Sequence, residues 1–200
     1  MPPVITRTPS NNHRKRSFAK PRFLLVAALL CRLCGWSAQA QMHPTDDDVK
    51  AGYLLNFGKF VRYPQDLPPN TFDICLLGQE SIGNVLETQL LDQHSQDRPV
   101  HIRHYDKAAD ARACAIVFMG ASEAARLDKD LAELEGSNAL TVSDVPQFME
   151  RGGMIQFVLQ NNNICFAINL TSATRAGLTL SSEFLKVAAY VTPIPSQEVP

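Results

Sequence analysis

The residues that could support chemistry are few in this 200-residue sequence, and they form no known catalytic or metal-binding pattern. The sequence contains no G-x-G-x-x-G, P-loop, G-x-S-x-G or H-E-x-x-H motif. His101 and His104 lie three apart in a segment that alternates like a strand, so their side chains point to opposite faces and cannot easily chelate one ion. We therefore expect no catalytic residue, no metal and no cofactor, and a protein that is not an enzyme.

Two short polar segments follow expected strands or helices. Ser143 and Asp144 come directly after a strand, where α/β enzymes place catalytic groups, so a hydrolase using this pair is one alternative. The same two residues also fit a helix N-cap. The Arg151-Gly152-Gly153 segment fits a helix C-terminal cap, or a place where a ligand or partner approaches the backbone.

The first forty residues have the pattern of a secretory signal peptide. They contain seven basic residues and no acidic one, and the apolar run FLLVAALL at 23–30 precedes the small residues of SAQA at 37–40. The apolar run is too short to span a bilayer, which takes about 20 residues. We expect 1–40 to be cleaved and the chain to be periplasmic, with no direct membrane insertion after cleavage. An uncleaved N-terminal anchor is the alternative.

Removal of 1–40 changes the charge of the chain. The whole sequence has 19 basic and 20 acidic residues, whereas 41–200 keeps 12 basic and all 20 acidic residues, a formal charge of −8. Nucleic acids and anionic lipid surfaces are bound by basic patches, so this composition argues against both as partners. The remaining length suits one domain with a sizeable core.

Three cysteines follow the signal segment, and two of them are expected to pair in an oxidising compartment. The sequence alone does not choose the pair, but Cys75 lies in the expected strand 72–78 and Cys114 opens the expected strand 114–120. Consecutive parallel strands often lie side by side, which would bring these two within disulfide range and leave Cys165 as a buried thiol. The alternative is that all three are ordinary buried cysteines.

Helices and strands are expected to alternate after residue 44. The segment 45–48 predicts a helix start, and apolar residues at three- and four-residue steps continue the helix to Tyr63, where Pro64 ends it. Apolar periodicity then predicts strands at 72–78, 98–105, 114–120, 139–142, 154–160 and 164–170, and helices at 81–91, 107–113, 122–134 (capped by Ser122), 144–153, 171–177 and 181–191.

This order of elements predicts the α/β class. We expect a single three-layer domain over 41–191, with a mostly parallel sheet, helices on both faces and a C-terminal antiparallel hairpin at the sheet edge. The asparagines at 161–163 predict the tight turn of that hairpin. Residues 192–200 are rich in proline and are expected to form a disordered tail.

Five segments, taken together and in this order, resemble the YfiR family of secreted bacterial proteins. They are VKAGYLLNFGKFVRYP (49–64), ICLLG (74–78), the strand opening at Cys114, LTVSDVPQFMERGGMIQFVLQNNNICFAINL (140–170) and AGLTLSSEFLKVA (176–188). The resemblance implies a periplasmic, non-enzymatic regulatory protein. Such a protein binds and represses the periplasmic sensor region of an inner-membrane diguanylate cyclase (YfiN-like), and thereby lowers cyclic di-GMP and biofilm or exopolysaccharide output.

The resemblance also implies further partners and site residues. It implies a homodimer and an outer-membrane lipoprotein (YfiB-like) that relieves the repression. Cys75 and Cys114 match the family's structural disulfide, while Cys165 has no evident partner. The segment 151–155 matches the family's most recognisable motif, and it serves either partner contact or the fold. Arg151, Gly152, Gly153 and Met154 are therefore candidate partner-binding residues.

A repressor has to bind the inactive state of its partner more tightly than the active state. Exposed apolar residues would serve such a contact. Leu54, Leu55 and Tyr63 on the first helix, and the edge of the final hairpin, are candidates, with core packing as the alternative. The competing function is a periplasmic small-molecule-binding (sensor) protein, since an α/β domain with a cleft at its strand ends suits one.

Overall fold

The computed structural model describes residues 44–64, 70–78, 81–90 and 94–192. The expected signal peptide at 1–40 lies outside these residues. The helices are α2 (Asp46–Phe57), α3 (Ile82–Gln89), α4 (Leu127–Leu134), α5 (Leu170–Arg175) and α6 (Ser182–Val187), with the short 3-10 helices η1 (Gly58–Phe60), η2 (Ala108–Ala111) and η3 (Ala121–Glu123). The strands are β1 (Val61–Arg62), β2 (Phe72–Leu77), β3 (His94–Ser95), β4 (Arg98–Tyr105), β5 (Ile116–Met119), β6 (Leu140–Ser143), β7 (Ile155–Gln160), β8 (Asn163–Asn169), β9 (Thr179–Leu180) and β10 (Tyr190–Thr192). Within the described residues, no helix is long and apolar enough to cross a membrane.

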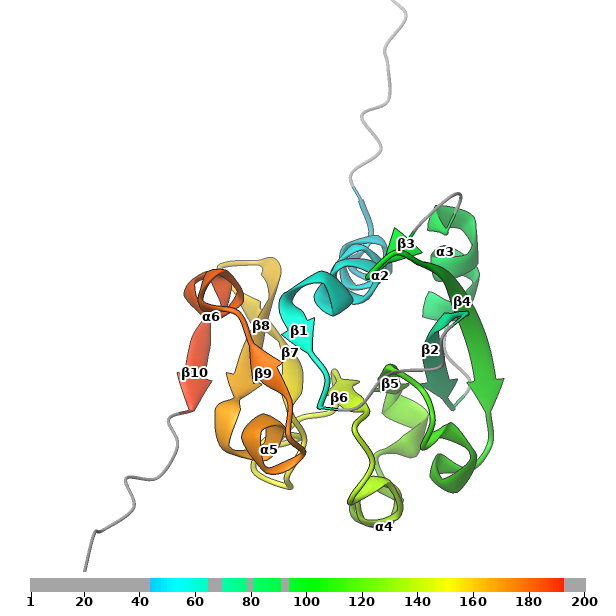
Figure 1. Cartoon of the computed structure of the whole chain (residues 1–200). Helices are drawn as coiled ribbons and strands as arrows, with labels where there is room; N and C mark the ends of the chain where they lie inside the picture. The colour runs from blue at the N-terminus through cyan, green and yellow to red at the C-terminus, as the bar shows by residue number, and fades with distance from the viewer. Residues whose placement is uncertain (1–43, 65–69, 79–80, 91–93, 193–200) are drawn as a thin grey trace, which may run out of the picture. The chain divides into compact units, whose positions relative to one another are not determined.

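One mixed sheet organises the part of the chain that the structure describes. Its strand order is β10-β8-β7-β6-β5-β2-β4-β3, and β1 and β9 form a separate antiparallel pair (Figure 1). Neighbouring strands from β4 through β7 run parallel, β7 and β8 form an antiparallel hairpin, and β10 runs parallel to β8. The expected α/β class, with a mostly parallel sheet and a C-terminal hairpin, is confirmed.

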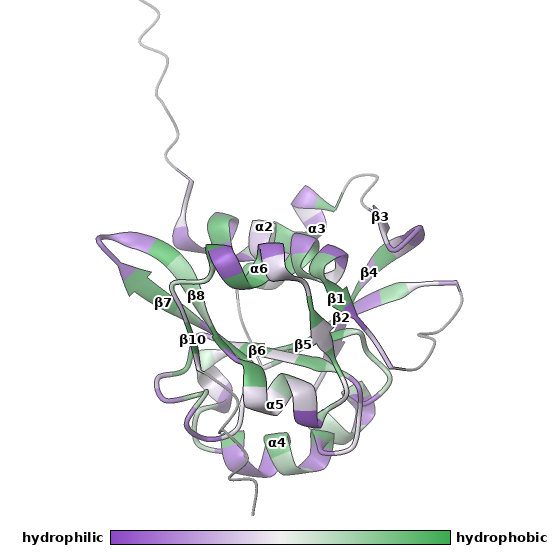
Figure 2. Ribbon diagram, turned by 60° about the vertical axis from the view of Figure 1, so that its left-hand side comes forward, coloured by the Kyte–Doolittle hydropathy of each residue, from purple (hydrophilic) through white to green (hydrophobic). Residues whose placement is uncertain are grey.

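Alternate side chains of the central strands enter two separate apolar cores. Ile74 and Leu76 of β2 pack in the core that includes residues of α2 and α6. Cys75 and Leu77 of the same strand pack in the core that includes residues of α4, called the α4-side core below. Figure 2 shows α2, α3 and α6 on one side of the sheet and α4 on the other. Burial on both faces explains why the central strands are continuous apolar runs in the sequence.

The first helix begins as expected but ends early. Thr45 caps α2, because its hydroxyl accepts from the Asp48 backbone N–H at 3.2 Å and the Asp48 carboxylate accepts from the Thr45 N–H at 2.8 Å. The expected end at Tyr63 is wrong, since the chain leaves α2 for η1 and β1. A Cβ on Gly58 would overlap the ring of Phe72, so this glycine lets the chain pass close to β2 before β1 pairs with β9.

Two other expected helices also differ from the structure. The segment 144–153 forms turns, because Gln147 has a φ of 62° and Phe148 is fully buried in the α4-side core. Ser122 does not cap a long helix, since residues 121–123 form η3 and α4 starts only at Leu127.

The β7–β8 hairpin has the turn that the asparagines predicted. Asn161 and Asn162 have φ angles of 49° and 62°, as a two-residue type I′ turn requires, and Gln160 lies opposite Asn163. Asparagine tolerates this left-handed region better than most residues do. The hairpin prediction is therefore confirmed.

The position of this hairpin at the sheet edge was wrongly predicted. Residues 181–191 were expected to be one helix, but α6 ends at Val187 and the chain returns to the sheet as β10. Tyr190 to Thr192 pair with Ala167 to Asn169, so β10 lies outside β8. Thr192, expected in the disordered tail, belongs to this strand, and 193–200 lie outside the described residues.

Candidate functional site

Cys75 and Cys114 form a disulfide with their Cα atoms 6.1 Å apart. Cys75 lies in β2, and Cys114 lies two residues before β5, the strand beside β2. Both residues are buried in the α4-side core. The predicted pairing is confirmed. Cys165 is free, and it is half-buried on β8 rather than fully buried as expected.

Leu54 and Leu55 belong to the core and are only 0% and 4% exposed. The expectation that these two side chains are free for partner contact is wrong, because the buried face of α2 is wide enough to include both. Tyr63 is half-buried, and its hydroxyl donates to the Ala115 carbonyl oxygen at 3.0 Å while its ring packs on Phe72. Burial raises the pKa of Tyr63 far above its usual value.

The segment 151–154 forms a turn that is tied to α4. Arg151 Nε donates to Asp128 Oδ1 at 2.5 Å, and its Nη1 donates to the Ala124 carbonyl oxygen at 3.2 Å. This hydrogen-bonded ion pair raises the pKa of Arg151 and lowers the pKa of Asp128. Gly152 has a φ of 102°, a region that favours glycine.

The rest of this turn serves the fold. A Cβ on Gly153 would overlap the ring of Phe148, which is fully buried beneath the turn. Met154 is 8% exposed, and its backbone N–H donates to Thr141 Oγ1 at 3.1 Å. Gly153 and Met154 therefore hold the turn against the sheet, while Gly152 is exposed and Arg151 is partly exposed.

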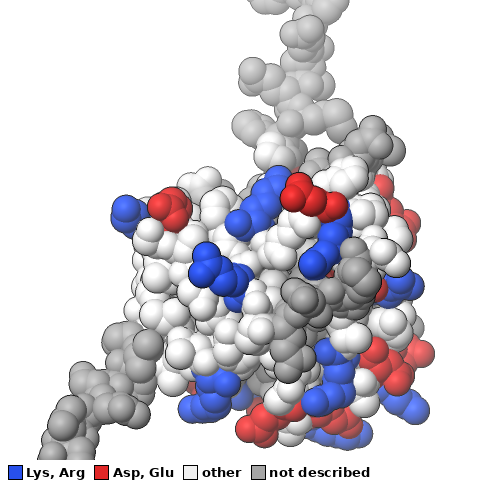
Figure 3. Space-filling model, in the orientation of Figure 1, with Lys and Arg blue, Asp and Glu red and all other residues white. Residues whose placement is uncertain are grey.

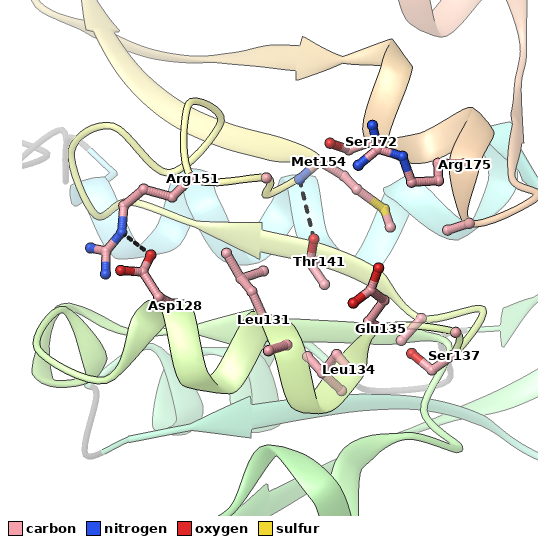
Figure 4. Close-up of a pocket in the computed structure, with 15 residues that line it drawn as sticks. Asp128, Leu131, Leu134, Glu135, Ser137, Thr141, Arg151, Met154, Ser172 and Arg175 are labelled. Atoms are coloured by element: carbon pink, nitrogen blue, oxygen red, sulfur yellow. Dashed lines mark hydrogen bonds and ion pairs between the residues drawn. The ribbon is translucent and has the colours of Figure 1, made fainter.

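A pocket of about 610 Å³ lies beside this turn, between α4, β6 and α5 (Figure 4). Its lining joins the turn to residues that sequence reasoning did not single out. They are Asp128, Leu131, Ala132, Leu134, Glu135, Gly136, Ser137, Ala139, Thr141, Ser172, Arg175 and Ala176, together with Arg151, Gly152 and Met154 of the turn. Their spread over the chain, from 128 to 176, gave no contiguous motif that could have revealed the pocket.

Exposed large apolar side chains lie elsewhere, on η1, β7, α6 and β10. Leu159 is 66% exposed, Val187 is 69% exposed and Tyr190 is 50% exposed. Phe60 is 38% exposed and stacks on Phe184 of α6, with ring centroids 5.6 Å apart. These four residues, Phe60, Leu159, Val187 and Tyr190, are the exposed apolar set. Strands β7, β8 and β10, which carry two of them, are neighbours at one end of the sheet (Figure 1).

Ser143 and Asp144, the pair considered above as candidate catalytic residues, both contact other residues of the fold. Ser143 donates to the Met119 carbonyl oxygen at 2.7 Å and accepts from the Val145 N–H at 3.0 Å. Asp144 forms an ion pair with Lys50 Nζ at 2.6 Å, which joins α2 to the end of β6. Within the described residues, no three His, Cys, Asp or Glu side chains are grouped to hold a metal ion.

Charged side chains are scattered over the face seen in Figure 3, where basic and acidic residues alternate with neutral ones. Two of the exposed histidines lie near carboxylates, with His101 Nδ1 at 3.9 Å from Asp73 Oδ1 and His104 Nε2 at 3.8 Å from Glu87 Oε1. Asp73 also accepts from Arg103 Nε at 2.6 Å. These contacts connect β4 to its neighbours β2 and α3.

Comparison with solved structures supports the fold. The chain is 12% identical to a conserved domain protein from Vibrio cholerae, with a TM-score of 0.50 over 74% of this chain and 60% of that chain. It is 14% identical to the ABC domain in complex with L-Trp from Streptococcus pneumonia, with a TM-score of 0.47 over 71% of this chain and 60% of that chain. The chain thus spans about three fifths of the length of each, and the first likeness shows the fold alone.

No protein of curated function matches the chain. The profile of the YfiR/HmsC-like family, in contrast, matches residues 47–189, which is nearly the whole of the described domain. Members of this family are, in general, periplasmic regulators of cyclic di-GMP signalling. The chain belongs to the YfiR/HmsC-like family.

Proposed function

We propose that this protein binds the periplasmic sensor region of an inner-membrane diguanylate cyclase and represses it. Repression would lower cyclic di-GMP in the cytoplasm, and with it exopolysaccharide and biofilm output. The observation that carries the proposal is the family match over 47–189. The Cys75–Cys114 disulfide supports it, because disulfides persist in oxidising compartments such as the periplasm.

The mechanism is a shift in the population of cyclase states. A periplasmic protein reaches a cytoplasmic second messenger only through a partner that spans the membrane. Binding has to favour the inactive state, since equal affinity for both states shifts nothing. A homodimer would present the contact surface twice, and an outer-membrane lipoprotein that competes for the same surface would relieve the repression.

The exposed apolar set is our candidate for that contact surface. Large apolar side chains in water gain free energy when a partner covers them, at roughly 25 cal/mol per Å². Leu159 is the residue that we choose for mutation, because it is 66% exposed and lies near the end of the hairpin. Arg151 and Gly152 remain partner-binding candidates through their exposed parts, whereas Leu54 and Leu55 do not.

The proposal is tested by binding between the purified protein and the periplasmic region of a membrane diguanylate cyclase from the same organism. We expect Leu159→Glu to weaken binding by at least about tenfold, because a charge at the centre of an apolar contact is left desolvated. The matched control is Gln160→Glu, which adds the same charge at the next exposed position. Equal binding by Leu159→Glu and the unaltered protein would exclude the hairpin from the contact, and no binding by the unaltered protein would contradict the proposed function.

A further inference from the structure

The pocket beside the 151–154 turn has cationic groups on two of its walls. Arg151 comes from the turn and is fixed by Asp128 and by the Ala124 carbonyl oxygen. Arg175 comes from the last turn of α5 and is exposed. Figure 4 shows the Arg151 guanidinium directed at Asp128 of α4, and Arg175 projecting from α5. A planar guanidinium is the side chain best suited to bind a carboxylate through paired hydrogen bonds.

Buried hydroxyl groups line the same pocket. Ser137 is 9% exposed, and its Oγ has no hydrogen-bond partner within the described part of the chain. Thr141 is 3% exposed, and its Oγ1 accepts from the Met154 N–H, which leaves its hydroxyl proton for another acceptor. A buried polar atom without a partner is costly, so Ser137 provides an independent indication that the pocket receives a hydrogen-bonding group.

The remaining lining is largely apolar. Leu131, Leu134 and Met154 contribute apolar side chains to the lining (Figure 4). A volume of about 610 Å³ lies in the range of pockets that bind small molecules. An occupant therefore needs an apolar body as well as a polar group.

The charge balance of the lining limits the charge of the occupant. The lining includes two guanidinium groups, of Arg151 and Arg175, and two carboxylates, of Asp128 and Glu135. Asp128 is already paired with Arg151, whereas no hydrogen bond or ion pair of the Arg175 side chain is found among the described residues. Since the two carboxylates repel further negative charge, phosphates and dicarboxylates are disfavoured and a single negative charge is preferred.

We infer that this pocket binds a small organic monocarboxylate with an apolar body, whose carboxylate pairs with Arg175. This site is additional to the protein contact proposed above and does not depend on it. The apolar body lies over Leu131 and Met154, and Ser137 or Thr141 supplies a further hydrogen bond.

Calorimetric titration of the purified protein with hexanoate tests the inference, with hexan-1-ol, hexylamine and inorganic phosphate as comparison ligands. We expect hexanoate to bind with a dissociation constant of about 1 mM or below, and the three comparison ligands to bind at least about tenfold more weakly. Methyl resonances of Leu131 and Met154 should shift on titration with hexanoate, which places the ligand in this pocket.

A pair of variants tests whether Arg175 is the group that pairs with the carboxylate. Arg175→Gln should weaken hexanoate binding at least about tenfold, since a charge-assisted hydrogen bond is lost. The matched control Lys186→Gln removes an exposed cation from the last turn of α6 and should leave binding unchanged. Absence of hexanoate binding, tighter binding of hexylamine, or unchanged binding by Arg175→Gln would each overturn the inference. If the unaltered protein binds hexanoate but does not bind the periplasmic region of the cyclase, only the proposed function is contradicted.

Discussion

Cys75 and Cys114, 39 residues apart in the chain, are joined by a disulfide in the core between the sheet and α4. The bond links β2 to the segment that enters β5, the strand beside it. It therefore closes a long loop that contains α3, β3, β4 and η2. The bond also ties together two strands at the centre of the sheet.

Reduction of this disulfide should lower the stability of the domain. A loop of this length corresponds to about 4 kcal/mol on the chain-entropy account, so Cys75→Ser should also lower the free energy of unfolding substantially. Urea unfolding under oxidising and reducing conditions measures the effect. Cys165→Ser is the control, because Cys165 is free and half-buried. Unchanged stability of Cys75→Ser under oxidising conditions would contradict the structural role of the bond.

Two glycine substitutions should have opposite effects. Gly153→Ala should destabilise the domain by about 1–3 kcal/mol, because the added Cβ would overlap the buried ring of Phe148. Gly52→Ala should stabilise it by about 0.5–1 kcal/mol, since Gly52 lies within α2 and nothing lies within 4 Å of an added Cβ. Thermal and urea unfolding check both values. A neutral Gly153→Ala would mean that this glycine does not serve the fold.

The stability of the domain should also depend on pH through Asp130. This residue is 4% exposed, and burial, followed by repulsion from Glu123, raises the pKa of its carboxyl above the ordinary value of 3.8. Because the pKa of Asp130 is raised in the folded state, the contribution of this residue to the free energy of unfolding is fully present below pH 3.8. That contribution is lost as the pH rises through the folded-state pKa. Asp130→Asn should therefore be more stable than the unaltered protein at neutral pH.

Urea unfolding at neutral pH and near the ordinary pKa of aspartate measures this difference. The gain from Asp130→Asn should shrink as the pH falls, because the native carboxyl becomes protonated and resembles the amide. Asp110→Asn, at an exposed position in η2, is the control and should change stability by less than about 0.5 kcal/mol at either pH. A gain that stays constant with pH would show that ionisation of Asp130 is not its cause.

The fold could be predicted from the sequence where a local pattern and its tertiary context agree. The buried runs that became β2 and β5 were unambiguous, and adjacent parallel strands led to the correct Cys75–Cys114 pair. The turn at Asn161 and Asn162 was equally direct, since few residues accept a positive φ. Strand β10 was missed because its three residues carry no periodic signal and form a strand only by pairing with β8.

The candidate site was predicted less well than the fold. Leu54 and Leu55 were assigned to a free helix face because helical periodicity does not report how wide the buried face is. The pocket was missed because its residues come from three separate stretches of the chain, 128–141, 151–154 and 172–176, which become neighbours only in the folded chain. Arg151 was expected to cap a helix over 144–153, but that segment forms turns, and its partner Asp128 lies 23 residues earlier and could not be inferred from spacing.

The central claim is that the protein represses a membrane diguanylate cyclase. The most direct test is the cyclic di-GMP content of cells in which the gene is deleted, compared with parent cells and with cells that carry the restored gene, under conditions where the protein is abundant. Our account predicts that deletion raises cyclic di-GMP, that the restored gene lowers it again, and that restoration with Leu159→Glu does not. An unchanged cyclic di-GMP level in the deletion strain would contradict the account.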